Sequence, residues 1–438
     1  MSTSLLAAAL VASACGGSDA EQAPAAGRES FEGTELRVLL KEGYEIEAIQ
    51  EFLPEFEEAT GIEVELEVYD EPTARQKLVL DATSGTGTYD VTSLSFWNVP
   101  EFVKAGWVEP LDAYIEDAKD EWLTIEDIPP SALDSMTVDD KLYALPHTIL
   151  GGMFFYRADV FEELGLQPPQ TTDEILAAAE VIAEKRPDLI PFTGRGAPTF
   201  ASLGTELGWA HGYGALLFDE DGTPQADSPE MTEAMTDFVT LMRDYGPEDA
   251  ASLTFTEASE RFSSGQAAMT FDTSGFGTIF EDPGQSKVAG NVGYTLPTGP
   301  AGNHLQWLYN EGLAVTSGSE NKNAAWLFLQ WRVSRDTTMK ELTELGRTDV
   351  PNLHVLASPE YAQYAEENGL VDFTEKLQET WKNSTAEHWP FYPEFAKIGD
   401  TFSAQISSAI ADSMSVEESL ETAQTELTSI MESAGYLD

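Results

Sequence analysis

A strand–helix–strand pattern within residues 34–69 limits the possible folds more than any other feature of the sequence. Residues 34–40 and 62–69 alternate apolar and polar side chains with the period of two that is typical of a half-buried strand. Between them, residues 46–60 place apolar side chains at helical spacing, and Gly61 supplies a natural helix end. Two strands linked through one helix indicate a βαβ unit, and such a unit requires a parallel sheet. We therefore expect an α/β fold.

Helix starts and short strands continue this pattern along the chain. An N-cap hydroxyl precedes a helical run at three places, namely Thr171 with Glu174, Ser228 with Pro229, and Ser415 with Glu418. Residues 321–334 also have helical spacing, and short strands are expected at 91–96 and 267–272. A chain of 438 residues is too long for one small core, so two domains or one two-lobed body is expected.

The charge balance is strongly acidic. The chain has 77 Asp and Glu against 23 Lys and Arg, a net charge of -54. Such a surface repels phosphate groups, which argues against nucleic acid and anionic membranes as partners. We interpret it as a solvated acidic face suited to salty or alkaline surroundings. Nothing after residue 30 approaches the about 18 consecutive apolar residues of a membrane span, so the body is expected to be soluble.

Cys15 is the only cysteine, and its surroundings resemble a bacterial lipoprotein signal. Residues 1–15 contain an apolar run that is followed by small residues directly before the cysteine. Residues 16–33 are polar, contain Gly, Ala and Pro, and are expected to form a flexible tether. The resemblance implies that Cys15 is lipidated and becomes the mature N-terminus. Ala12 stands where Leu is usual, and the first basic residue is Arg28, which a misplaced start codon would explain. A disordered Ala-rich terminus with an incidental cysteine is the alternative.

The sequence contains no catalytic signature. A nucleotide-binding glycine motif, a zinc-protease motif and a nucleophile elbow are all absent, and the five His residues show no metal-ligand spacing. Residues 219–222 are predicted to form a turn with Gly222 at positive φ. We therefore expect no catalytic residue, no cofactor and no metal site.

Aromatic residues recur beside polar ones in segments that look like loops. These segments are residues 41–45, 95–100, 208–214 and 306–312. Sugars and polyols present C–H faces and hydroxyl groups, which aromatic rings and polar side chains bind respectively. A core position is the alternative for each tryptophan taken singly.

Two longer blocks, residues 89–112 and 141–179, are similar to the extracellular solute-binding proteins of carbohydrate ABC importers, as in maltose- and polyol-binding proteins. The first contains Tyr-Asp-Val, an aromatic residue, Ala-Gly-Trp and Pro-Leu-Asp, and the second contains Leu-Pro, Tyr-Arg-x-Asp-x-Phe and Pro-Pro-x-Thr. Further blocks match in family order at 221–230, 262–272, 293–302 and 317–331.

The resemblance implies a two-lobed, periplasmic-binding-protein-like fold of type II, in which hinge strands join two α/β sandwiches. The first lobe is expected to contain residues 34–145 plus 297–345, and the second 146–296 plus 346–438. A sugar or polyol would bind in the interlobe cleft, and the closed monomer would dock on a membrane permease. Lipid at Cys15 would hold this extracytoplasmic protein at the outer face of the cell membrane, and no enzymatic activity is implied.

The same resemblance implies a set of ligand-binding residues, with Trp97 as the ring that stacks on a sugar. The full set is Glu42, Tyr44, Trp97, Asn98, His147, Trp209, His211, Tyr213, Asp272, Trp307, Asn310, Glu311 and Arg347. One departure concerns the residues after Leu145–Pro146, where polyol- and maltose-binding relatives often carry an acid. Here only His147 and Thr148 are available, which leaves the identity of the ligand open.

Two alternatives differ in function. A secreted glycoside-acting enzyme would need two carboxylates facing each other across the cleft at about 5–10 Å. The same fold could instead hold a polyamine or a metal chelate, and aromatic rings fit the cationic polyamine better than the chelate.

Overall fold

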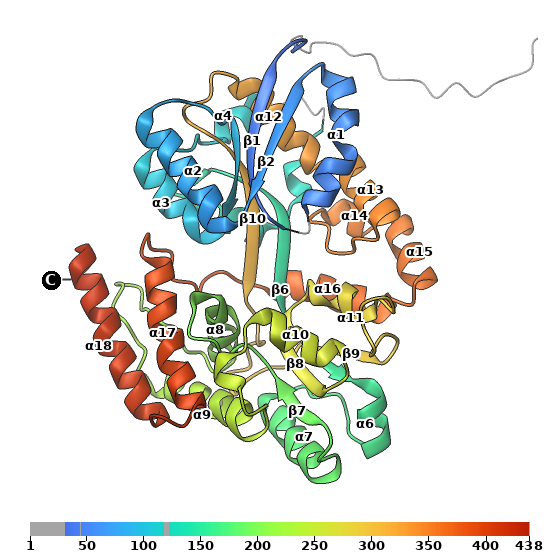
Figure 1. The fold of residues 1–438 in the computed structure, drawn as a ribbon, viewed down its shortest axis with the longest axis vertical. Helices are drawn as coiled ribbons and strands as arrows, with labels where there is room; N and C mark the ends of the chain where they lie inside the picture. Colours follow the sequence, from blue (N-terminus) through green and yellow to red (C-terminus); the bar gives the residue numbers. More distant parts are fainter. Residues whose placement is uncertain (1–30, 44, 118–121, 438) are drawn as a thin grey trace, which may run out of the picture.

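The structure is a computed structural model that describes residues 31–43, 45–117 and 122–437. Figure 1 shows two α/β lobes, one blue, cyan and orange and the other green, yellow and red, joined by long strands. The predicted two-lobed α/β fold is confirmed. Residues 1–15, most of the tether and Tyr44 lie outside the described residues, and so does the proposed lipidation site Cys15.

The sheet of the first lobe begins with the predicted βαβ unit. Strand β1 (Glu35–Lys41) pairs in parallel with β2 (Glu63–Tyr69) in continuous register, and with β3 (Val91–Ser95). Helix α1 (Ile46–Thr60) connects β1 to β2 and ends at Gly61, whose φ is 74°. The helix turns its apolar stripe, including Ile49, Phe52 and Phe56, into the core. Periodicity alone therefore identified this unit correctly.

One long strand carries both lobes. Strand β6 (Leu145–Arg157) pairs through residues 145–151 with β10 (Leu308–Val315), which also pairs with β3. Through residues 152–157 the same strand pairs with β8 (Ala267–Thr273) and β9 (Val292–Thr295). Strand β7 (Ile190–Thr193) completes the sheet order β2-β1-β3-β10-β6-β8-β7. Because β6 lies in both halves, its first eleven residues are buried, including the polar His147 and Thr148.

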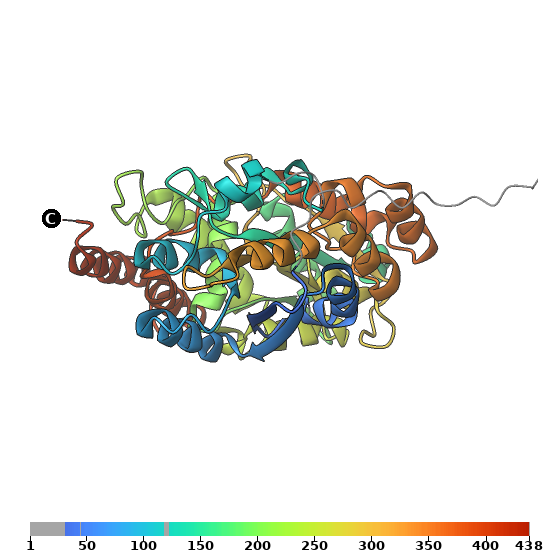
Figure 2. The same ribbon diagram turned by 90° about the horizontal axis from the view of Figure 1, so that it is seen from above.

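Helices cover both lobes (Figures 1 and 2). Those in the first half of the chain are α2 (Glu71–Ser84), α3 (Val99–Ala105), α4 (Asp112–Asp117), α5 (Pro130–Ser135), α6 (Ala158–Leu164), α7 (Thr172–Lys185) and α8 (Leu203–Gly212). Those in the second half are α9 (Pro229–Asp244), α10 (Phe255–Ser263), α11 (Phe276–Glu281), α12 (Lys322–Arg332), α13 (Arg335–Leu345), α14 (Leu353–Leu356), α15 (Pro359–Glu367), α16 (Val371–Asn383), α17 (Phe395–Ile410) and α18 (Val416–Ala434). Short 3₁₀ turns are η1 (Phe96–Asn98), η2 (Ile125–Asp127), η3 (Phe200–Ser202) and η4 (Ala250–Ser252), and a two-stranded ribbon joins β4 (Thr137–Val138) to β5 (Lys141–Leu142).

Most of the predicted caps form. Ser415 and Glu418 make a reciprocal capping box at α18, and Ser228 caps α9. At α7 the Thr171 hydroxyl accepts from the backbone of Glu174, but the Glu174 carboxylate accepts from the N–H of Gln170 and not of Thr171.

The remaining local predictions concern one helix and one turn. The helix expected over 321–334 ends at Arg332, because Ser334 caps a new helix, α13. The predicted turn at 219–222 is present, with Gly222 at φ 78°.

The predicted lobe boundaries remain a prediction. Two segments pack against the other lobe than the one to which they were assigned. Residues 297–307 were assigned to the first lobe, yet Thr298 exchanges backbone hydrogen bonds with the segment at 170–172, next to α7 of the second lobe. Helices α14 and α15 were assigned to the second lobe, yet both contact α13. None of the helices in the described part of the chain combines the length and apolar character needed to cross a membrane.

Candidate ligand-binding site

A cavity of about 1070 Å³ lies where the two lobes face each other. The first lobe lines it with residues at or after the carboxyl ends of β1, β2 and β3, the edge at which open α/β sheets bind ligands. The second lobe contributes the segment after β7, the start of α8, α10, α11 and the loop before α17. The main wall residues are Lys41, Glu71, Trp97, Thr148, Arg195, Phe200, Phe255, Trp307, Tyr309, Glu311, Arg347, Trp389 and Phe395.

Lys41, the last residue of β1, is the centre of a buried polar group on the first-lobe wall. Its ammonium donates to Tyr309 Oη at 2.7 Å and Ser95 Oγ at 3.1 Å, and it forms an ion pair with Glu311. Burial alone would lower the pKa of Lys41, but the charges of Glu311 and then Glu71 raise it above the usual value. Lys41 therefore stays charged at neutral pH.

Trp97 lies at the junction of the two lobes. Its ring stacks on Phe395 of α17, with centroids 5.3 Å apart and planes 8° apart, and meets Tyr309 at 5.4 Å. The side chain of Trp97 is 9% exposed and lines the cavity. Since Phe395 covers one face of the indole, only the rest of the ring is available to a ligand.

Trp307 forms the second-lobe side of the cavity, and its position depends on glycines in α8. A Cβ at Gly208 would lie 2.6 Å from Trp307 Cδ1, and one at Gly204 would lie 3.4 Å from the same indole. One turn further, a Cβ at Gly212 would lie 2.5 Å from Leu305. The spacing of four residues places all three glycines on one helix face, so the chain before β10 packs directly on the helix backbone. The Trp307 indole N–H has no partner among the described residues.

Arg195 is held on the cavity wall by Asp272 of β8. The guanidinium donates to the Asp272 carboxylate, with Nε 2.9 Å from Oδ2, and through Nη1 to the Ala201 carbonyl at 2.7 Å. Asp272 is 1% exposed and does not line the cavity. The sequence predicted Asp272 as a ligand contact; in the structure its carboxylate holds Arg195, which lines the cavity in its place.

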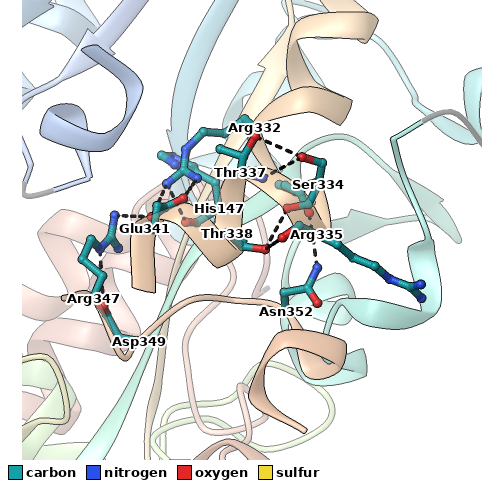
Figure 3. A network of polar contacts seen from close by, with 11 residues as sticks. His147, Arg332, Ser334, Arg335, Thr337, Thr338, Glu341, Arg347, Asp349 and Asn352 are labelled. Carbon is teal, nitrogen blue, oxygen red and sulfur yellow. Dashed lines mark hydrogen bonds and ion pairs between the residues drawn. The ribbon is translucent and has the colours of Figure 1, made fainter. Parts of the chain in front are cut away.

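Arg347 is connected to the crossing strand β6 through a buried ionic network (Figure 3). Arg347 Nη1 lies 2.8 Å from Glu341 Oε2, and the same carboxylate pairs with Arg332, which is fully buried like Glu341. Arg332 Nη2 in turn donates to the backbone carbonyl of His147 at 3.5 Å. The network fixes Arg347 at the cavity wall relative to a strand that both lobes share.

The comparisons with known proteins agree with this architecture. The model of the bacterial extracellular solute-binding protein family matches residues 42–339, more than half of the chain. The chain belongs to this family. The mannitol-binding protein of Pseudomonas aeruginosa is 28% identical over 384 residues, covering 84% of this chain and 86% of that protein.

Solved solute-binding proteins share the fold. A solute-binding protein of Agrobacterium vitis, solved with bound D-mannitol, matches with a TM-score of 0.78 and 29% identity over 92% of this chain and 99% of its own. A solute-binding protein of Agrobacterium radiobacter, solved with ribitol, matches with a TM-score of 0.80 and 24% identity, covering 92% of this chain and 100% of its own, and at that identity it supports the fold alone.

In this solute-binding protein the cavity brings together five of the residues predicted from sequence, namely Glu42, Trp97, Trp307, Glu311 and Arg347. Seven others do not line it: Asn98, His147, Trp209, His211, Tyr213, Asp272 and Asn310. We therefore leave these seven out of the proposed contact set.

Most of the seven have structural partners instead. Trp209 is fully buried against Phe238 and Phe271, on a different side of α8 from the glycines. Tyr213 donates to the Asp237 carboxylate at 2.5 Å.

Three other residues of these seven, all polar, also have structural surroundings outside the cavity. The Asn310 amide donates to the Ala132 carbonyl at 2.8 Å. His211 faces His388, with ring centroids 5.4 Å apart. His147 is fully buried, and burial lowers its pKa well below the usual value, so it is neutral.

Several cavity residues were not predicted from the sequence, among them Lys41, Glu71, Arg195, Tyr309, Trp389 and Phe395. A signal existed for the first three, because each lies at or just beyond the carboxyl end of a parallel strand. Within the described residues no cluster of three or more His, Cys, Asp or Glu could hold a metal ion. The site can stack apolar C–H faces on its rings and bind hydroxyl groups through its charged side chains.

Proposed function

We propose that this chain is the extracytoplasmic binding component of an ABC importer and that it binds a sugar or polyol in the interlobe cavity. The observation that carries the proposal is the composition of the cavity wall, which combines aromatic rings from both lobes with buried charged groups that are themselves fixed by ion pairs. The relative named as mannitol-binding, and the 29% identical structure with D-mannitol, support a polyol or a related sugar.

Delivery of the ligand requires the lobes to close over it and to open again. Strands β6 and β10 cross between the lobes and provide the hinge, so closure would bring Lys41 and Glu71 toward Arg195. In our proposal the closed monomer docks on the permease subunits of the importer. Lipid attached at Cys15 anchors it at the outer face of the cell membrane.

A thermal-shift screen tests the proposal directly. Four- to six-carbon alditols, monosaccharides and oligosaccharides are added one at a time, and a ligand that binds only the native state raises the melting temperature. At 100 times its Kd such a ligand stabilises the fold by about 2.7 kcal/mol. We expect one or a few members of the panel to shift the transition, with no hydrolysis of any glycoside. If no carbohydrate or polyol shifted it while simple polyamines did, the proposal would be wrong.

A further inference from the structure

The charged groups that line the cavity do not balance. Three cations line the cavity, and each already pairs with a carboxylate: Lys41 with Glu311, Arg195 with Asp272, and Arg347 with Glu341 and Asp349. Six further carboxylates line the same cavity and have no ion pair within 4 Å among the described residues, and two of them, Glu45 and Glu71, act electrostatically on Lys41. Glu45 is only 3% exposed. The wall around Lys41 therefore carries three carboxyl groups, those of Glu45, Glu71 and Glu311, and one ammonium. Burial raises the pKa of Glu45 and of Glu71, so a second cation beside them would favour their ionised form.

Two unpaired buried oxygens at this wall supply an independent observation. Glu311 Oε2 and Thr148 Oγ1 have no hydrogen-bond partner in the described part of the chain, although both residues are 1% exposed. Glu311 and Thr148 are direct partners across the β10–β6 pairing, and both line the cavity. A buried carboxylate oxygen without a donor is costly, so the site lacks a group that supplies hydrogen-bond donors.

A protonated amine meets these requirements better than a hydroxyl group. An ammonium has three donors and no acceptor, whereas a hydroxyl donates one hydrogen bond. Hydrogen bonds between an ammonium and a carboxylate are also roughly twice as strong as neutral ones. The neighbouring rings already accommodate a cation, because the Lys41 ammonium lies 5.6 Å from the Trp97 centroid and 5.4 Å from that of Tyr309.

We infer that the preferred ligand is a hydroxylated compound with one protonated amine, an amino alditol or amino sugar, whose ammonium group lies at the wall formed by Glu45, Glu71 and Glu311. Its carbon chain contacts Trp97 and Trp307, and its hydroxyl groups reach Arg195 and Arg347. The inference rests on the proposed function and narrows it to a charge class. It also excludes anionic sugars such as sugar acids, which would face the surplus carboxylates.

Matched ligands that differ only at carbon 1 test the charge class. In both the gluco and the manno configuration, the neutral alditol, the 1-amino-1-deoxy alditol and the aldonate are titrated calorimetrically at pH 7 into the full chain. We expect the amine to bind at least about tenfold more tightly than the neutral alditol, and the aldonate to bind most weakly. Tighter or equal binding of the neutral alditol would overturn the inference and leave the proposed function intact. If none of the compounds bound, and no other carbohydrate did, the proposed function would fail with it.

Variants then assign the preference to this wall. Glu71→Gln is expected to lower the ratio of amine to neutral-alditol affinity at least about threefold, because it removes a charge and keeps the shape. Glu45→Gln should act in the same direction. Glu51→Gln is the matched control, since Glu51 is exposed on α1 and does not line the cavity. An unchanged ratio of amine to neutral affinity in both Glu45→Gln and Glu71→Gln would refute the assignment.

Discussion

Replacing Glu206 by Gln should stabilise this protein, and the gain should grow with pH. Glu206 lies on α8 with 1% exposure, and its Oε2 accepts a hydrogen bond of 2.7 Å from Ser403 of α17. Its Oε1 has no partner among the described residues. Burial raises the pKa of Glu206 from 4.5 to about 8, so the carboxyl group is protonated in the fold at neutral pH.

The sign and size of the effect follow from proton linkage. Between pH 4.5 and about 8 the unfolded chain has Glu206 ionised and the folded chain has it protonated, so the free energy of unfolding falls as pH rises. Each pH unit costs about 1.4 kcal/mol, which gives about 2 kcal/mol at pH 6 and about 5 kcal/mol above pH 8. Glutamine keeps the volume and the acceptor for Ser403 but does not titrate. The variant should therefore match the wild type at pH 4.5 and exceed it by a few kcal/mol at pH 8.5.

Urea denaturation followed by tryptophan fluorescence at several pH values between 4.5 and 8.5 measures this difference. Glu180→Gln, at an exposed position on α7, is the control and should show no such trend. A stability difference for Glu206→Gln that does not change with pH would refute the reasoning, as would a variant less stable than the wild type at pH 8.5.

Three further substitutions test the site and its supports. Trp307→Ala should lower stability by about 3–5 kcal/mol and ligand affinity at least about tenfold, measured by denaturation and calorimetry, because it empties the surface packed on α8. Arg195→Met should cost about 3–5 kcal/mol by leaving the Asp272 carboxylate buried and unpaired, and adding Asp272→Asn should restore most of that loss. His388→Phe should reduce the decrease in the free energy of unfolding as pH falls below 6.5. Burial lowers the pKa of His388 to about 3, so between pH 6.5 and 3 only the unfolded chain binds a proton at this residue. The phenyl ring can still stack on Trp389.

Each of these has a contradicting outcome. Unchanged affinity in Trp307→Ala would remove the indole from the site. If Arg195→Met with Asp272→Asn is no more stable than Arg195→Met alone, the unpaired Asp272 carboxylate does not cause the loss of stability. Parallel pH–stability curves for His388→Phe and the wild type would show that this imidazole is solvated in the fold.

The first βαβ unit could be predicted from sequence because the apolar spacing of a strand or of a helix is a local property of that segment. Alternation in β1 and β2 and helical spacing in α1 each reflect one buried face of one element, and Gly61 marks the helix end. The same holds for the caps of α9 and α18, which depend on neighbouring residues only.

Helix α8 could not be predicted in the same way. Residues 208–214 looked like a loop, yet most of them lie in α8, which also contains Gly204, Gly208 and Gly212. Glycine in a helix interior costs about 1 kcal/mol relative to alanine. The structure offsets this cost by packing Trp307 and Leu305 directly on the helix backbone. That contact joins segments about a hundred residues apart, so only the pattern of glycines four residues apart could have indicated it.

The candidate site was half predictable for a related reason. Trp97 and Trp307 lie next to strand ends, Glu311 lies within β10, and all three line the cavity. Trp209 and Asp272 have the same residue types as the cavity residues, but their side chains are buried. Whether such a side chain reaches the cavity depends on which face of α8 or β8 packs against the other elements. Residue type alone does not contain that information.

A calorimetric titration of the full chain with the polyol or amino polyol that raises its melting temperature most is the direct test of ligand binding in the interlobe cavity. We expect one site per chain, a negative heat-capacity change from burial of apolar surface, and loss of the heat in Trp307→Ala. Saturable binding that Trp307→Ala and Arg195→Met both leave unchanged, or no heat from any sugar or polyol with folded protein, would contradict it.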